Sequence, residues 1–276
     1  MPTMQITMAD KNNIFQLMKK ITFIFANLLF ILVLISCNDK KMTEVVEVPL
    51  PTVQEKVKIG NPNDLKANEG SFQLEKLSFG YDALAPDLSA LTLESHYKNY
   101  LYYTNSLNKT VLGTDKENLS IEDILKKLDI TDTELRNNAG GYYNHTLYFN
   151  SISPKAGGEP TDTLASKITK DFGSFSNFKT VFKETASKQF GSGWVWLIVD
   201  KTGVLQLSTT QNQDNPLMAY APVVGFHGTP ILGIDLWEHA YFLDFQYKKK
   251  NYIDAFFNIV NWEKVNDNYK ATFKSK

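Results

Sequence analysis

An aspartate and a histidine four residues apart, Asp235 and His239, carry the most specific chemical signal in the sequence. On a helix, this spacing places both side chains on one face. Apolar residues flank the pair, which predicts that it is buried, and a buried charge needs a partner or a metal ion. A carboxylate and an imidazole are suitable ligands for a first-row transition metal. The alternative is an ordinary Asp–His pair on a solvated helix.

Two further histidines, His96 and His145, lie in aromatic stretches that favour helices. For either one alone, the alternative is a core imidazole whose hydrogen bonds are satisfied. The fourth and last histidine, His227, is predicted to lie in a loop and has no assigned role. Three of the four histidines therefore remain candidates for one site, if the fold brings them together.

The elements that must position these residues begin with two long helices. The first is predicted from about residue 90 to 112, with Ser89 or Thr92 as its cap, and its apolar face is wide and aromatic. The second is predicted over 131–150, and a modest connection joins the two into a hairpin. A stretch rich in Pro and Gly, 151–162, marks a domain boundary.

The C-terminal part alternates between helical and strand patterns. Helices are expected over 163–172 and 175–190, strands over 191–199 and 204–209, a third strand at 223–226 or 230–234, a helical turn over 235–242 and a last helix over 252–261. Long helices followed by a meander with helices predict an α+β fold. We expect an N-terminal hairpin of long helices, followed by a C-terminal domain with a three-stranded antiparallel sheet and helices.

Composition narrows the class of protein. The chain has 276 residues, of which 43% are hydrophobic, enough for a sizeable core. Its formal net charge is −1, and nothing in the composition indicates nucleic-acid binding. The single cysteine, Cys37, excludes an intrachain disulfide.

The N-terminal stretch indicates export. A basic pair at 19–20 precedes an apolar run over 21–35, which is shorter than the roughly 20 residues of a spanning helix. The run ends in Leu-Ile-Ser-Cys, which resembles the bacterial lipobox and predicts a lipidated Cys37. The expected location is the bacterial cell envelope, anchored by lipid outside the cytoplasm, periplasmic or at the outer membrane. An uncleaved membrane anchor is the alternative.

Four segments follow from these patterns. Residues 1–36 are predicted to be a lipoprotein signal peptide and residues 37–70 a polar, flexible tether. Residues 71–152 are the expected helical hairpin domain, and residues 160–276 the expected C-terminal α/β domain.

The stretch Asp-Leu-Trp-Glu-His-Ala-Tyr at 235–241 resembles the D-x-W-E-H-A-Y motif of iron/manganese superoxide dismutases. The resemblance extends through most of 72–262 and includes Asn-Asn-Ala-Gly-Gly-x-x-Asn-His at 137–145. It implies superoxide dismutase activity at one manganese or iron ion per subunit. The ligands that it implies are His96, His145, Asp235 and His239.

The same resemblance implies roles around the metal. Tyr103 matches the tyrosine at the gateway to the metal, and Gln213 matches the glutamine that hydrogen-bonds the coordinated solvent. In typical iron enzymes of the family, this glutamine comes from the hairpin, at the position of Gly141, whereas in typical manganese enzymes it comes from the sheet region. The chain therefore has the manganese pattern, with iron as a possible substitute.

The resemblance also implies apolar residues around the metal, a cation that attracts the substrate, and a homodimer. Trp194 and Trp237 match residues of the apolar wall, and Lys249 replaces a family Arg as a cation that attracts the superoxide anion. A homodimer is expected, in which Glu238 of one subunit pairs with His239 of the other.

One departure from the family concerns this dimer interface. Members usually carry a histidine that bonds a tyrosine across the interface. With a one-residue deletion after Tyr97, the chain has Asn99 and Phe242 at these two positions, whereas an ungapped match would put Tyr100 at the first. Both partners of the contact have changed, so neither leaves the other unpaired. We expect a dimer that is held without this bridge.

Two other functions fit parts of the pattern. One is a metal-free dismutase-fold lipoprotein that acts as a binding or scaffold module, which the presence of all four ligands disfavours. The other is a metal-dependent oxygenase, which usually shows two histidines and one carboxylate, so the third histidine disfavours it.

Overall fold

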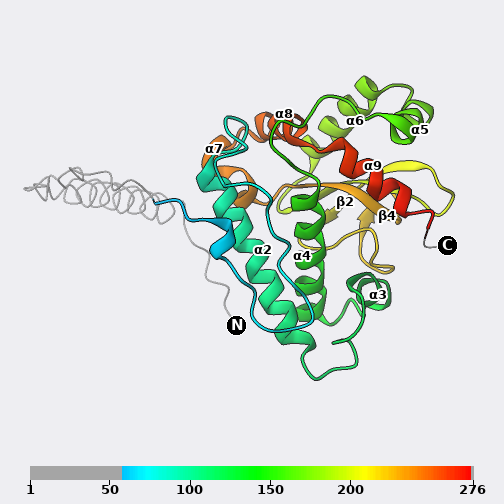
Figure 1. Cartoon of the computed structure of the whole chain (residues 1–276). Helices are drawn as coiled ribbons and strands as arrows, with labels where there is room; N and C mark the ends of the chain where they lie inside the picture. Colours follow the sequence, from blue (N-terminus) through cyan, green and yellow to red (C-terminus); the bar gives the residue numbers. More distant parts are fainter. Residues whose placement is uncertain (1–57, 275–276) are drawn as a thin grey trace, which may run out of the picture. The chain divides into compact units, whose positions relative to one another are not determined.

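The computed structural model describes residues 58–274 (Figure 1). The predicted signal peptide, Cys37 and the predicted tether up to residue 57 lie outside these residues. Among the residues described, none of the helices is both long and apolar enough to span a membrane.

Two long helices, α2 (Ala90–Val111) and α4 (Thr133–Asn150), form the predicted hairpin and run side by side (Figure 1). Polar side chains cap the N-terminus of both: the hydroxyl of Ser89 accepts from the N–H of Thr92, and the carboxylate of Asp132 accepts from that of Leu135. Aromatic rings pack between α2 and α4, in agreement with the wide aromatic face predicted for the first helix. The short helix α3 (Ile121–Lys127) lies in the connection and is also capped by a serine.

Residues 58–70, which include the 3₁₀ helix η1 (Pro62–Asp64), lie against α2; we call them the docked segment. Side chains of α2 accept hydrogen bonds from the backbone here, and the bonds are Gly60 N to Glu94 Oε1 (3.3 Å), Asn68 N to Asn105 Oδ1 (2.7 Å) and, just beyond, Phe72 N to Asn108 Oδ1 (2.8 Å). This last part of the predicted tether therefore contacts the domain. Hydrophobic periodicity does not reveal such docking, because polar side chains and backbone groups make it.

The C-terminal part begins with α5 (Asp162–Phe172) and α6 (Phe175–Lys188) and continues into an antiparallel sheet. The strands are β1 (Gly193–Val199), β2 (Leu205–Gln211), β3 (Val223–Val224) and β4 (Thr229–Asp235), in the order β3-β2-β1-β4. The α+β prediction is confirmed, but the described sheet has four strands. Both stretches that competed for the third strand form strands, one on each side of the β1–β2 pair.

The chain after the sheet differs from the prediction of one last helix. The elements are η2 (Glu238–Ala240), α7 (Phe242–Phe245), α8 (Lys249–Ile259) and α9 (Trp262–Ala271). The break falls at Asn261, whose side chain accepts from the N–H of Lys264 and so starts a new helix. A cap inside a helical pattern is the signal that separates α8 from α9.

Candidate metal centre

Asp235 and His239 do not share a helix. Asp235 is the last residue of β4, and His239 lies in η2. The helical turn predicted over 235–242 is present only as η2, so its predicted start at Asp235 is wrong. The two side chains still meet, with His239 Nε2 3.0 Å from Asp235 Oδ2. The N–H of Trp237 donates to the other carboxylate oxygen at 2.8 Å, which closes a tight turn after the strand.

The structure brings the four candidate ligands together from four elements. His96 comes from α2, His145 from α4, Asp235 from the end of β4 and His239 from η2. One ligand atom of each lies within 4.8 Å of the others. Asp235 Oδ2 is 3.1 Å from His96 Nε2 and 3.6 Å from His145 Nε2. Asp235 is therefore the common neighbour of the three imidazoles.

The charge states in this cluster suit metal binding. Burial lowers the pKa of His96, and it lowers that of His145 further, which favours neutral imidazoles with a free lone pair. Burial alone would raise the pKa of Asp235, but the charge and hydrogen bond of His239, together with the close approach of His96, bring this pKa below its usual value. The centre thus offers three imidazole nitrogens and one ionised carboxylate.

Two imidazole nitrogens test whether a metal ion fits. His96 Nε2 is close to Asp235, yet among the described residues neither it nor His145 Nε2 makes an aligned hydrogen bond. His145 Nδ1 lies 2.7 Å from the carbonyl oxygen of Gly141, so it carries the ring proton and leaves Nε2 without one. Buried polar atoms are normally paired, and these nitrogens converge on their neighbours without bonding them. Three nitrogens and one oxygen form a donor set that suits manganese or iron.

Gln213 connects the sheet region to the rings around His145. Its Nε2 donates to the hydroxyl of Tyr103 at 3.2 Å. Its Oε1 accepts from Trp194 Nε1 at 3.1 Å and from Asn144 Nδ2 at 3.1 Å. The rings of Tyr103 and Trp194 lie 5.2 Å and 5.4 Å from that of His145. The predicted pair, Tyr103 and Gln213, is therefore joined by a hydrogen bond beside the centre.

Gly141 makes room for this arrangement. A Cβ atom at residue 141 would overlap the ring of Tyr103, so the position accepts no longer side chain while the tyrosine keeps its place.

Burial raises the pKa of Tyr103, although the bond from Gln213 acts in the opposite direction. The phenol therefore stays protonated near neutral pH.

The other predicted site residues surround the centre at different depths. Trp194 is fully buried, and the ring of Trp237 stacks on that of His239 at 5.8 Å. The ammonium of Lys249 donates to the carbonyl of Gln189 at 3.0 Å, and burial lowers its pKa, with Glu238 opposing this shift. A steering role for Lys249 stays a prediction.

The residues predicted at the dimer interface lie partly at the surface of the single chain. Glu238 is exposed and Phe242 is half-exposed. The amide of Asn99 turns back to its own helix and donates to the carbonyl of Ser95 at 3.1 Å.

His227, to which the sequence assigns no role, lies apart from the centre. Its Nδ1 is 3.3 Å from the carbonyl of Pro216, in a loop, as predicted.

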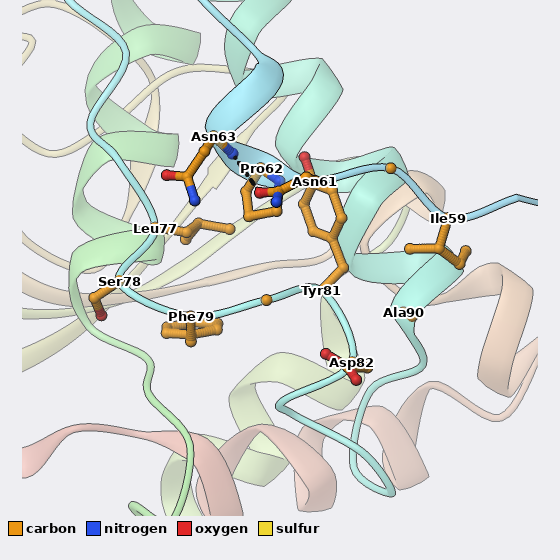
Figure 2. A pocket seen from close by; sticks show the side chains of 12 residues that line it. Ile59, Asn61, Pro62, Asn63, Leu77, Ser78, Phe79, Tyr81, Asp82 and Ala90 are labelled. Carbon is orange, nitrogen blue, oxygen red and sulfur yellow. Dashed lines mark hydrogen bonds between the residues drawn. The ribbon is translucent and has the colours of Figure 1, made fainter.

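A cavity of about 810 Å³ lies elsewhere, between the docked segment and the loop that precedes α2 (Figure 2). Asn61 and Asn63 border it on one side, and Phe79 and Tyr81 on the other. None of the predicted site residues lines it, so it belongs to the docked segment and not to the metal centre.

Two family models match the chain. Residues 71–153 match the alpha-hairpin domain of iron/manganese superoxide dismutases, and residues 160–268 match the C-terminal domain of the same enzymes. The chain belongs to the iron/manganese superoxide dismutase family. Proteins of this family bind manganese or iron, and the two matched regions contribute two candidate ligands each.

Sequence reasoning missed the polar residues that hold Gln213 in place. Asn144 bonds both the side chain and the backbone carbonyl of Gln213, and Asn215 donates to Asn144 Oδ1 at 3.0 Å. Both asparagines are fully buried. The available signal was the position of Asn144, which directly precedes a candidate ligand on a helix.

Proposed function

We propose that this dismutase-family protein is an active superoxide dismutase, which converts superoxide to dioxygen and hydrogen peroxide at one manganese or iron ion per subunit. The observation that carries the proposal is the convergence of three imidazole nitrogens and one carboxylate oxygen, all within 4.8 Å. His96, His145, Asp235 and His239 would hold the ion. Three histidines disfavour an oxygenase, which usually uses two and one carboxylate.

A bound manganese or iron ion would supply a one-electron change between its trivalent and divalent forms, which alternately oxidises and reduces superoxide. The protein supplies the setting for this chemistry. Asp235 contributes one negative charge to the ligand set, and the rings around His145 exclude bulk water. Reduction of superoxide to peroxide consumes protons. Tyr103 accepts its hydrogen bond from Gln213, so its own O–H is free to donate a proton.

We also propose a preference for manganese, with iron as a substitute. The amide near the centre comes from Gln213 in the sheet region, and Gly141 leaves no room for a longer side chain beside Tyr103. Loading the apoprotein with each metal in turn tests this preference. Activity with iron alone would contradict it.

Metal analysis and a superoxide-consumption assay on the purified protein test the proposed activity. We expect about one ion per chain and catalytic removal of superoxide. A protein that carries no redox metal and consumes no superoxide would instead support the alternative, a dismutase-fold binding or scaffold module.

We propose a lipid anchor at Cys37 and a location in the bacterial cell envelope, outside the cytoplasm. The apolar run over 21–35 and the lipobox-like Leu-Ile-Ser-Cys support this proposal. Cys37→Ser should move the protein to the soluble fraction with unchanged specific activity. If the variant stays on the membrane, the apolar run is an uncleaved anchor.

We propose a homodimer in which Glu238 of one subunit pairs with His239 of the other, without a bridge between Asn99 and Phe242. The exposure of Glu238 and the half-exposure of Phe242 leave both available to a second copy. Phe242→Tyr alone should then change dimer stability little, while Phe242→Tyr with Asn99→His should show positive coupling in a double-mutant cycle. Additive effects would contradict the idea.

A further inference from the structure

Three residues of α4 at intervals of four, Arg136, Gly140 and Asn144, lie on one stripe of the helix. All three contact the same short turn, Gln213 to Asn215. Arg136 binds Asp214, Gly140 touches the backbone of Gln213, and Asn144 bonds both Gln213 and Asn215. Helix α4, which carries His145, therefore also binds the turn that carries Gln213.

Gly140 sets how closely the turn approaches the helix. A Cβ atom here would overlap the carbonyl oxygen of Gln213 and would press on the end of the Met218 side chain. Glycine inside a helix costs about 1 kcal/mol relative to alanine. Since the overlapping atom belongs to the backbone, no side-chain rotation could relieve it. Only a shift of the turn away from α4 would accommodate an alanine.

An ion pair between Arg136 and Asp214 also holds the turn against α4. Arg136 Nε lies 2.6 Å from Asp214 Oδ1, and Nη2 lies 2.5 Å from Oδ2, which is a two-pronged contact. Asp214 is nearly buried, and its carbonyl accepts from the hydroxyl of Thr210 at 2.6 Å. The position of Asp214 is thus fixed on both sides, and it directly follows Gln213.

The side chain of Gln213 has little freedom to compensate for a displaced backbone. Its Oε1 already accepts from Trp194 and Asn144, so Nε2 is left to donate to Tyr103, whose ring lies 5.2 Å from that of His145. We propose that Gly140 and Arg136 are positioning residues: through the 213–215 turn they set the distance of the Gln213 amide from the bound metal, and so tune the metal's reduction potential. This inference rests on the proposed metal centre.

The direction of the effect follows from the donor character of Nε2. An N–H donor near solvent bound to the metal stabilises the negatively charged form of that solvent, which accompanies the more highly charged ion. Withdrawing the donor favours the divalent state. Displacement of the turn should therefore raise the reduction potential.

The test uses Gly140→Ala in the full chain, loaded with manganese or iron, and measures metal content, reduction potential and thermal stability. We expect retained metal, a higher reduction potential and activity lowered about tenfold. A tenfold change in the relative affinity for the two oxidation states corresponds to about 59 mV. Asn137→Ala, an exposed position on the same helix, is the matched control and should leave the potential unchanged.

Arg136→Gln is a second route, in case the alanine prevents folding. It removes the charge from Asp214 but leaves both asparagine contacts, so the potential should rise by less than with Gly140→Ala. Arg136→Lys keeps the charge and loses the two-pronged geometry, and it should lie between Arg136→Gln and the unaltered chain.

The outcomes separate this inference from the proposed activity. If the unaltered chain binds metal but consumes no superoxide, the proposed function fails, and the potentials still report on Gly140 and Arg136. Unchanged potentials in folded, metal-loaded Gly140→Ala and Arg136→Gln overturn the inference. Loss of metal in proportion to activity also overturns it, because the stripe would then only help to fold the centre.

Discussion

Helix α2 serves two regions of the molecule with two of its faces. One face directs His96 and Tyr103 to the candidate metal centre. The other directs Glu94 and Asn105 to the docked segment and Asn108 to Asn68 and Phe72. At the centre, three imidazole nitrogens and a carboxylate converge, and every member except the partly exposed His239 is buried. Along the docked segment, side chains bond single backbone groups, partly within reach of water. Metal binding restricts the residue types on the face that carries His96 far more than hydrogen bonding to backbone groups restricts those on the other face.

The largest effect should come from breaking the centre. Asp235→Ala removes the common neighbour of three imidazoles and the only carboxylate of the set. Partners that merely support metal ligands cost about 10–100-fold when changed, and the loss of a ligand should exceed this range. We expect metal content and activity to fall together. A variant that keeps a full complement of metal and its full rate would show that Asp235 is not a ligand.

A smaller effect is expected from Gln213→Ala, which leaves the ligands in place. It removes the bond to Tyr103 and the acceptor for Trp194 and Asn144, so activity should fall about 10–100-fold while the metal is retained. Parallel measurements of metal content and superoxide consumption check this separation. Metal loss equal to the activity loss would contradict it.

The sequence predicts the candidate metal centre much better than it predicts the docked segment. The candidate ligand set and the hairpin could be predicted because few residue types bind such a metal and because Asn-Asn-Ala-Gly-Gly and Trp-Glu-His are specific patterns. The helical spacing of Asp235 and His239 gave a correct pairing for a wrong reason, since a strand end and a 3₁₀ turn bring them together. Local patterns cannot reveal a contact that depends on the path of the chain between two elements.

The same limit explains what sequence reasoning missed elsewhere. The ion pair between Arg136 and Asp214 joins residues 78 positions apart. The docked segment has no apolar periodicity, so it was indistinguishable from a tether. Amide side chains and backbone groups can form such contacts almost anywhere, and only the folded geometry selects among them.

Deleting residues 58–70 should affect stability and leave the centre intact. The deletion removes the backbone bonds to Glu94 and Asn105 and one wall of the cavity beside Phe79. Individual bonds contribute about 0.5–1.5 kcal/mol, so we expect a loss of about 1–2 kcal/mol. For a domain of this size, that corresponds to a melting temperature roughly 2–8 °C lower. Metal content should not change, and a large loss of metal would show that the two faces of α2 are coupled.

The smallest effect should come from Asn105, on the face of α2 that contacts the docked segment, and Asn108 on the same face is its matched comparison. The side chain of Asn105 accepts one bond, from the N–H of Asn68, whereas Asn108 bonds both the N–H and the carbonyl of Phe72 at 2.8 Å. Asn108 is also nearly buried. Asn105→Ala should therefore cost about 0.5–1 kcal/mol, because water can reach the freed group. Asn108→Ala should cost about 1–3 kcal/mol, because it strands buried groups. Thermal unfolding of both variants, with and without residues 58–70, measures the difference. In the deleted chain, Asn105→Ala should cost nothing further, since its partner is gone, while Asn108→Ala should keep most of its effect. Equal costs for both asparagines in both chains would mean that these bonds do not hold the docked segment.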